Sequence, residues 1–238
     1  MSEWLTPDEL LEQWRVAVEL DIPHASIRIG DGEACIAAHE EILTMNFIRE
    51  TYNWINNINY CGVTLPNMDA RIRLIAALKQ ADFIGILHQL NWWGWRPLSD
   101  MVIKYYDIQP EKIFYAFDNV NISKMPRFYD TFKNTRILLV GNKARKYKEV
   151  LERRYEWKRI VGTVECQNWT MVDAAINKMD HYDYQLAIVS AGVPAKVLAA
   201  HAKLTGHVGI DFGQGTDGCI VADMKGLNTW EDTRYKAP

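Results

Sequence analysis

The sequence predicts an α/β protein with a Rossmann-like, doubly wound, mainly parallel sheet and helices on both faces. In the second half, short apolar runs at 137–140, 160–164, 186–189 and 208–210 alternate with helical patterns at 144–155, 171–179 and 194–204. Strands that alternate with helices in this way indicate parallel βαβ units. The runs are also almost continuously apolar, which is typical of parallel strands covered on both faces.

The first half shows the same alternation less regularly. Thr6, Pro7 and Glu9 have the spacing of a capping box with proline in the first turn, and an apolar stripe through Trp14 follows, so we expect a helix there. Next come an apolar strand at 25–29, a helix from about 33 past 39, a helix at 69–80, a strand at 83–87, a helix at 98–106 and a strand at 113–117. Segment 44–66 has no clear period. No linker or repeat divides the chain, which predicts a single domain over 1–238.

Composition narrows the class of protein. The 238 residues are 48% hydrophobic and 24% charged, as in ordinary globular proteins. A net charge of −3 argues against a dedicated nucleic-acid binder. No apolar run is long enough to span a bilayer. The four cysteines form no metal-type pair, and the polar first residues do not resemble a secretory leader, so we expect reduced thiols and a cytoplasmic protein.

The stretch Arg-Ile-Gly-Asp-Gly-Glu at 28–33 is the most informative motif. Gly30 and Gly32 allow a tight turn at the end of the predicted strand. In an extended segment, Asp31 and Glu33 would point the same way and could hold a hard divalent cation together with phosphate oxygens. The alternative is a turn whose acidic residues cap the next helix. The hexapeptide alone leaves both interpretations open.

Other unusual residues also follow predicted strands. These are the segments 88–96, 141–143, 190–192 and 211–215. In open α/β sheets ligands bind beyond the carboxyl ends of the strands, so we expect all these loops to meet at one edge. Of the scattered histidines, only His88, at a strand end, is a candidate for a function, and no His-based metal motif appears.

Two of these loops have alternative interpretations. Segment 190–196 has the small residues and following helix of a phosphate cradle, although such turns also serve close helix packing. Segment 91–96 carries three tryptophans, which suit stacking on sugars or bases but also suit a core or interface plug.

Both ends of the chain resemble bacterial glycosyltransferases of the GT-D fold. Segment 28–33 is similar to their R-[FYI]-G-D-G-E signature. Segment 190–213 resembles their S-A-G-x-x-A-K-x-L-A…G…I-D-[IF]-G block, in the same order and spacing. The middle of the chain, at about 44–130, matches poorly. Gln214 stands where a histidine often follows in that family.

The resemblance implies a nucleotide-sugar-dependent glycosyltransferase with a D-x-E metal site. It implies that Asp31 and Glu33 hold Mn²⁺ or Mg²⁺ on the donor diphosphate, where the cation stabilises the leaving group. Arg28 would pair with these carboxylates or reach the diphosphate, while a structural ion pair is an equal alternative. Asp211 would orient the donor or act as a base. The remaining expected cofactor-binding residues are Gly30, Gly32, Ser190, Gly192, Lys196 and Gly213.

We therefore expect a metal-dependent glycosyltransferase that moves a sugar from a UDP-sugar to a glycan or glycoprotein acceptor, in a bacterium or its phage. The alternative is a non-catalytic nucleotide or nucleotide-sugar binding module. A metal-dependent phosphohydrolase is a weaker third hypothesis, because it would require more convergent acids. Nine tryptophans leave room for an apolar interface, so a homo-oligomer is a further expectation.

Overall fold

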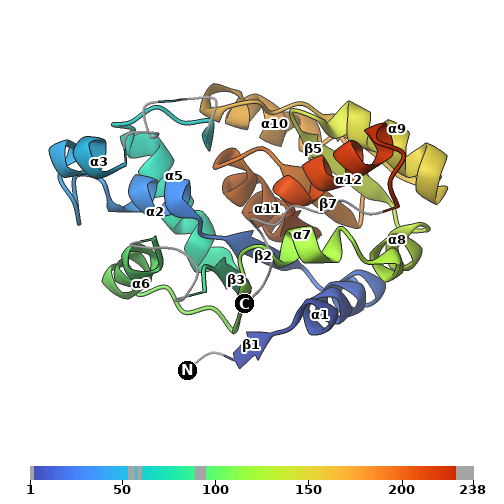
Figure 1. The fold of residues 1–238 in the computed structure, drawn as a ribbon, viewed down its shortest axis with the longest axis horizontal. Coiled ribbons are helices and arrows are strands. Elements are labelled where there is room, and N and C mark those ends of the chain that lie inside the picture. Colours follow the sequence, from blue (N-terminus) through green and yellow to red (C-terminus); the bar gives the residue numbers. More distant parts are fainter. Residues whose placement is uncertain (1–2, 53–56, 58–60, 89–94, 229–238) are drawn as a thin grey trace.

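A computed structural model describes residues 3–52, 57, 61–88 and 95–228 of the chain. Its strands form one eight-stranded sheet in the order β1-β4-β3-β2-β8-β7-β5-β6, and every neighbouring pair is parallel (Figure 1). The strands are β1 Glu3–Leu5, β2 His24–Arg28, β3 Phe83–Ile86, β4 Lys112–Tyr115, β5 Ile137–Gly141, β6 Ile160–Val164, β7 Leu186–Ser190 and β8 Val208–Asp211.

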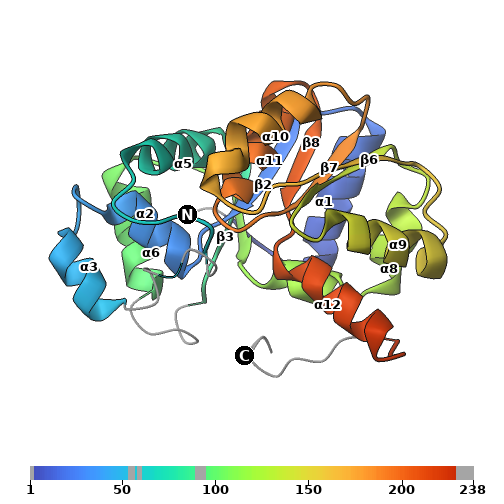
Figure 2. The same cartoon turned by 90° about the horizontal axis from the view of Figure 1, so that it is seen from above.

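Helices cover both faces of this sheet (Figure 2). One face is covered by α2 Asp31–Ala38, α5 Met68–Gln80, α6 Trp95–Tyr105, α10 Val172–Met179 and α11 Pro194–Leu204. α3 Met45–Thr51 lies beyond α2, away from the sheet, and joins the same hydrophobic cluster. The other packs against α1 Pro7–Glu19, α7 Asp118–Ile122, α8 Pro126–Phe132, α9 Ala144–Tyr155 and α12 Gln214–Met224. The predicted doubly wound α/β class is therefore confirmed.

Alternation along the central strands divides the core into two layers. In β5, Leu138 and Val140 join the cluster under α11, while Ile137 and Leu139 join the cluster under α9. All four are buried, as expected for a parallel strand covered on both sides. Gly209 brings α11 close to the sheet, because a Cβ there would lie 2.1 Å from a carbonyl oxygen of that helix.

Most predicted elements appear with small shifts at their ends. The capping box of α1 is present, and α9, β6 and α11 have the predicted limits. The sequence prediction missed β1, α3, α7, α8 and α12. The first four are short, and α12 has no strong apolar stripe because its buried positions are mostly small residues while its accessible positions include Val221 and Met224.

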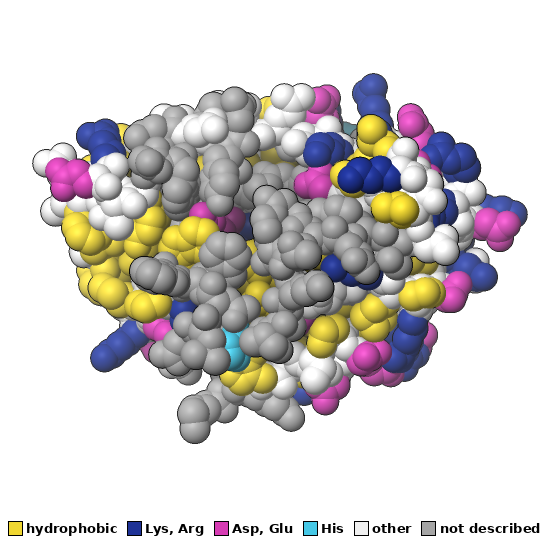
Figure 3. Space-filling view, in the orientation of Figure 1, with side chains coloured by type: hydrophobic (Ala, Val, Ile, Leu, Met, Phe, Trp, Pro, Cys, Tyr) yellow, Lys and Arg dark blue, Asp and Glu magenta, His cyan; other side chains and the backbone are white. Residues whose placement is uncertain are grey.

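Surface properties differ between the two ends of the molecule. In the view of Figure 3, charged side chains gather on the side of α9 and α1, while a hydrophobic area lies on the side of α3 and α6. Exposed hydrophobic residues on those two helices include Phe47, Met101 and Tyr105. A homo-oligomer stays a prediction.

Within the described ranges, no helix combines the length and apolar character that a bilayer crossing requires.

His24 provides a test of the core near β2. Its imidazole is buried, Nε2 lies 2.8 Å from Ser26 Oγ, and Nδ1 lies 3.4 Å from Asp82 Oδ2. Burial lowers the pKa of His24 to about 4; Asp82 opposes this effect and Lys203 adds to it. The unfolded chain therefore binds more protons between pH 6.5 and 4, and the stability present at neutral pH is lost as the pH falls through this range.

We predict that His24→Asn reduces this acid-induced loss. The free energy of unfolding of the wild type should fall more between pH 6.5 and 4 than that of the variant, by up to about 3 kcal/mol. Urea unfolding at several pH values measures both curves. Parallel curves for the two proteins would show that His24 does not carry this effect.

Candidate functional site

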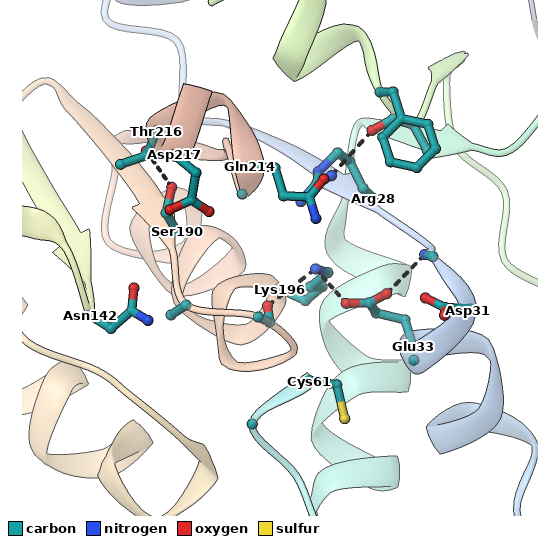
Figure 4. Close-up of a pocket in the computed structure, with 18 of the residues that line it drawn as sticks. Arg28, Asp31, Glu33, Cys61, Asn142, Ser190, Lys196, Gln214, Thr216 and Asp217 are labelled. Atoms are coloured by element: carbon teal, nitrogen blue, oxygen red, sulfur yellow. Dashed lines mark hydrogen bonds and ion pairs between the residues drawn. The ribbon is translucent and has the colours of Figure 1, made fainter. Parts of the chain in front are cut away.

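A cavity of about 560 Å³ opens at the carboxyl edge of the sheet (Figure 4). This volume lies within the range of small-molecule binding sites. Loops after strands β2 to β8 line it, so the expected meeting of these loops is observed. The predicted site residues that line it are Arg28, Gly30, Asp31, Gly32, Glu33, Ser190, Gly192, Lys196 and Gly213.

Asp211, at the end of β8, is the buried anchor beneath this cavity and does not line it. Its side chain is 0% exposed and accepts two hydrogen bonds from the guanidinium of Arg28, from Nε at 3.1 Å and from Nη2 at 3.0 Å, and a third from the backbone N–H of Arg28 at 3.3 Å. Lys196 Nζ lies 3.0 Å from Asp211 Oδ2, the oxygen that also accepts from Arg28 Nε. Burial raises the pKa of Asp211, but the charges of Arg28 and Lys196 outweigh burial and hold that pKa below its ordinary value. Asp211 is therefore a poor base.

Lys196 links the two carboxylates of the site. Besides Asp211, its Nζ lies 2.6 Å from Glu33 Oε1 and donates to the carbonyl of Gly192 at 3.2 Å. The ammonium carries three N–H groups, these three oxygens surround it, and its side chain is 3% exposed. We therefore interpret Lys196 as a residue that holds the site together rather than one that grips phosphate.

Glu33 follows the alternative interpretation of the motif, in which an acid caps the helix. Its Oε2 accepts a 2.9 Å hydrogen bond from the backbone N–H of Gly30, the residue before α2. Gly30 leaves space for this contact, because a Cβ there would lie 2.8 Å from the same oxygen. Glu33 thus fixes the start of α2 and the position of Lys196 at once.

Asp31 is the first residue of α2, so the extended geometry expected for Asp31 and Glu33 is wrong. Residues two apart on a helix do not share a face. Both acids nevertheless line the cavity, because the turn before the helix sits at its wall (Figure 4). Asp31 is only partly buried, whereas Glu33 is buried.

The donor set fits a cation that shares its ligands with a substrate. Among the residues that the structure describes, no cluster of three or more acidic, histidine or cysteine side chains could enclose a metal ion. Mg²⁺ and similar hard ions are commonly held by one or two carboxylates plus phosphate oxygens and water. Asp31 matches this pattern, and Glu33 could add an oxygen only while it keeps its contacts to Gly30 and Lys196.

Arg28 presents its guanidinium to the cavity while Asp211 holds it. Nη1 donates to the carbonyl of Ala116 at 3.2 Å, and Nη2 bonds Asp211. These contacts use one N–H of each terminal nitrogen, which leaves a second N–H on each for an anion. Gly213 provides the space, since a Cβ there would lie 1.9 Å from Nη2. Both interpretations of Arg28, the ion pair and the anion contact, are compatible with this geometry.

The small residues of the turn at Ser190–Gly192 allow a close approach of another part of the backbone, at Cys61, and the phosphate cradle stays a prediction. Gly192 has φ +64°, and a Cβ there would lie 2.7 Å from the carbonyl oxygen of Cys61. The backbone N–H groups of Val193, Ala195 and Lys196 all donate to carbonyls within the protein. Ser190 still faces the cavity, with its Oγ 2.6 Å from Thr216 Oγ1.

Asn142 and Lys143, in the segment 141–143 that the sequence analysis named, also line the cavity. Other polar lining residues were not singled out from the sequence: Cys61, Gln167, Thr216 and Asp217. Their only signal was that most follow the ends of strands. Of the tryptophan-rich loop, Trp95 lines the cavity, while segment 89–94 lies outside the described residues. His88 is half-buried, and its Nδ1 has no hydrogen-bond partner among the described residues.

Comparison with known proteins places this architecture among related folds. A family model described as a GT-D fold-like domain matches residues 5–219. The chain is similar to a structure described as a new glycosyltransferase of the domain of unknown function 1792 from Streptococcus sanguinis. The TM-score is 0.58 at 15% identity, and the match covers 96% of this chain and 87% of that one.

Two further solved structures give the same result. One is a selenomethionine-substituted domain of unknown function 1792, with a TM-score of 0.57. The other is described as this domain with a distinct glycosyltransferase fold, with a TM-score of 0.56. Each is 13% identical, over 99% of this chain and 89% of the other. No curated protein matches the sequence.

We predict that Gly213→Ala disrupts the site more than a matched glycine replacement. Its methyl group would collide with the guanidinium of Arg28, in addition to the strain of a positive φ. Gly206→Ala is the control, because Gly206 also has a positive φ but has nothing within 4 Å of the added Cβ. Thermal unfolding should show a loss about 1 kcal/mol or more larger for Gly213→Ala. Equal losses would contradict the described position of Arg28.

Proposed function

Since this chain belongs to the GT-D-like family, whose fold is that of glycosyltransferases, we propose that it transfers a sugar from a UDP-sugar to a glycan or glycoprotein acceptor with the help of Mn²⁺ or Mg²⁺. Family membership supports a glycosyltransferase in general. The donor, the metal ion and the acceptor are our proposal. It rests on the contents of the cavity at the carboxyl edge of the sheet.

The observation that carries the proposal is the pairing of an acid and a guanidinium on one cavity wall. Asp31 and Arg28 both line the cavity; Arg28 is the last residue of β2, and Asp31 follows three residues later. A carboxylate suits a cation bound to a diphosphate, and the two remaining N–H groups of Arg28 suit phosphate oxygens. One wall therefore offers both kinds of contact that a nucleoside diphosphate requires.

Asp31 would hold the metal ion, and Glu33 would add a carboxylate oxygen while it keeps its contacts to Gly30 and Lys196. When bound, this ion would neutralise the charge that develops on the departing diphosphate. The chain itself orients the donor: Arg28 would bond the phosphates from the side opposite its contact with Asp211. Asp211 keeps that guanidinium fixed and is not proposed as the base, because it is buried beneath the cavity and its pKa is lowered.

The two ends of the cavity suit different parts of the reactants. The end of the cavity nearest β5, β7 and β8 carries the amide and hydroxyl groups of Asn142, Ser190 and Thr216. These polar groups suit the ribose and base of a nucleotide. Leu87 and Trp95 line the end beyond β3, where we place the transferred sugar and its acceptor.

We predict that Asp31→Asn lowers sugar release from a UDP-sugar with Mn²⁺ by at least about a hundredfold, because the metal ion loses its main protein ligand. The matched control is Asp173→Asn, which changes an exposed acid in the first turn of α10, outside the cavity. The measurement is release of UDP and free sugar across a panel of UDP-sugars.

Thermal shift on the same samples distinguishes the alternative. Stabilisation of the wild type by UDP-sugar and Mn²⁺ with no release of UDP would favour a non-catalytic binding module. Full turnover by Asp31→Asn would refute the metal assignment.

A further inference from the structure

A small aromatic and basic cluster lies beside the cavity and has no role in the proposed donor contacts. It consists of Trp4 on β1, His88 after β3 and Arg96 in the first turn of α6. The ring centroids of Trp4 and His88 lie 6.1 Å apart. The guanidinium carbon of Arg96 lies over the Trp4 ring, 5.7 Å from its centroid. Three elements of the fold therefore converge on one indole.

The cluster is continuous with the cavity wall. Arg96 Nη1 donates to the carbonyl of Leu87 at 3.0 Å, and Leu87 lines the cavity. Trp95, next to Arg96 in the chain, lines the cavity as well. Arg96 therefore contacts both the cavity wall, at Leu87, and the ring of Trp4.

Trp4 is held in place yet open to solvent. It lies in a strand, in register with Ile113 of β4, and Arg96 packs over its ring. It remains 42% exposed in spite of these contacts. A fixed indole loses little conformational entropy when a ligand packs on it, and its flat apolar surface matches the C–H face of a pyranose.

Local charge favours a neutral sugar. Arg96 Nε lies 2.7 Å from Asp100 Oδ1, so the charge of Arg96 is already balanced.

His88 Nδ1 is buried without a hydrogen-bond partner among the described residues. Such an unpaired atom costs stability and is tolerated more often at functional sites.

We propose that Trp4 is the stacking platform for the acceptor, and that the acceptor is a neutral glycan with β-linked, gluco-configured pyranose units. Sugars of this configuration carry their ring C–H bonds on flat faces that fit an indole. This inference rests on the proposed function, because the donor occupies the opposite end of the cavity. The acceptor chain then runs from the cavity, past Leu87 and Trp95, to Trp4.

The test measures glycan binding at Trp4 directly. The full chain is labelled with 5-fluorotryptophan, and Trp4→Phe identifies the Trp4 signal in the ¹⁹F NMR spectrum by its loss. Cellotriose and tri-N-acetylchitotriose are the probes, each titrated to 20 mM in the presence of UDP and Mg²⁺, which is diamagnetic and does not broaden the signals. Trp4→Tyr provides the assignment if Trp4→Phe does not fold. We expect at least one probe to shift the Trp4 signal saturably.

Variants then establish whether the ring carries the binding. Trp4→Ala should lower the affinity for that probe at least about fivefold, while UDP release by donor hydrolysis stays unchanged. Trp169→Ala is the matched control, because Arg73 also packs over Trp169, at 5.4 Å, but Trp169 follows β6, at the opposite edge of the sheet from Trp4 on β1. It should leave the affinity unchanged.

The outcomes separate the two proposals. No shift of the Trp4 signal with either probe, or shifts at other tryptophans only, would overturn the platform even if UDP-sugars are hydrolysed. Absence of UDP release from every UDP-sugar would instead remove the proposed function, whatever the NMR spectrum shows. Saturable binding that Trp4→Ala does not weaken would also overturn the platform.

Discussion

The buried carboxylate of Asp211, held between two cations, is the constraint on which the rest of the site depends. It holds both Arg28 and Lys196, which share its Oδ2, and Lys196 in turn holds Glu33. Removing one partner from such a cluster leaves an uncompensated buried charge, which commonly costs about 3–5 kcal/mol. This one network therefore ties the ends of β2 and β8 to the starts of α2 and α11, and it sets the wall of the cavity.

Much of the fold and the place of the site could be predicted from the sequence. Short apolar runs marked the central strands because those strands are buried on both faces, as Leu138 and Leu139 illustrate. The parallel arrangement then required the loops after the strands to meet at one edge. For this reason nearly all predicted site residues line a single cavity, although they come from both ends of the chain.

The roles of individual residues were less predictable, because they depend on contacts between distant segments. Glu33 and Lys196 lie 2.6 Å apart in space, and nothing in either local pattern indicates that pairing. Similarly, Gly213 was expected to bind a cofactor, which stays a prediction, and the structure adds that its missing side chain makes room for Arg28. The local pattern around Asp31 was compatible with a strand end or a helix start, and only packing decided for the helix.

A double-mutant cycle with Lys196→Met and Asp211→Asn tests the central network most directly. Chemical denaturation would give the free energy of unfolding of the wild type, both single variants and the double variant. We expect each single change to lower the free energy of unfolding by about 3 kcal/mol or more, and the double variant to lose much less than the sum. The reason is that each single variant leaves the other buried charge without this partner. Losses that add to within about 0.5 kcal/mol would show that the two side chains are not coupled and would contradict the account.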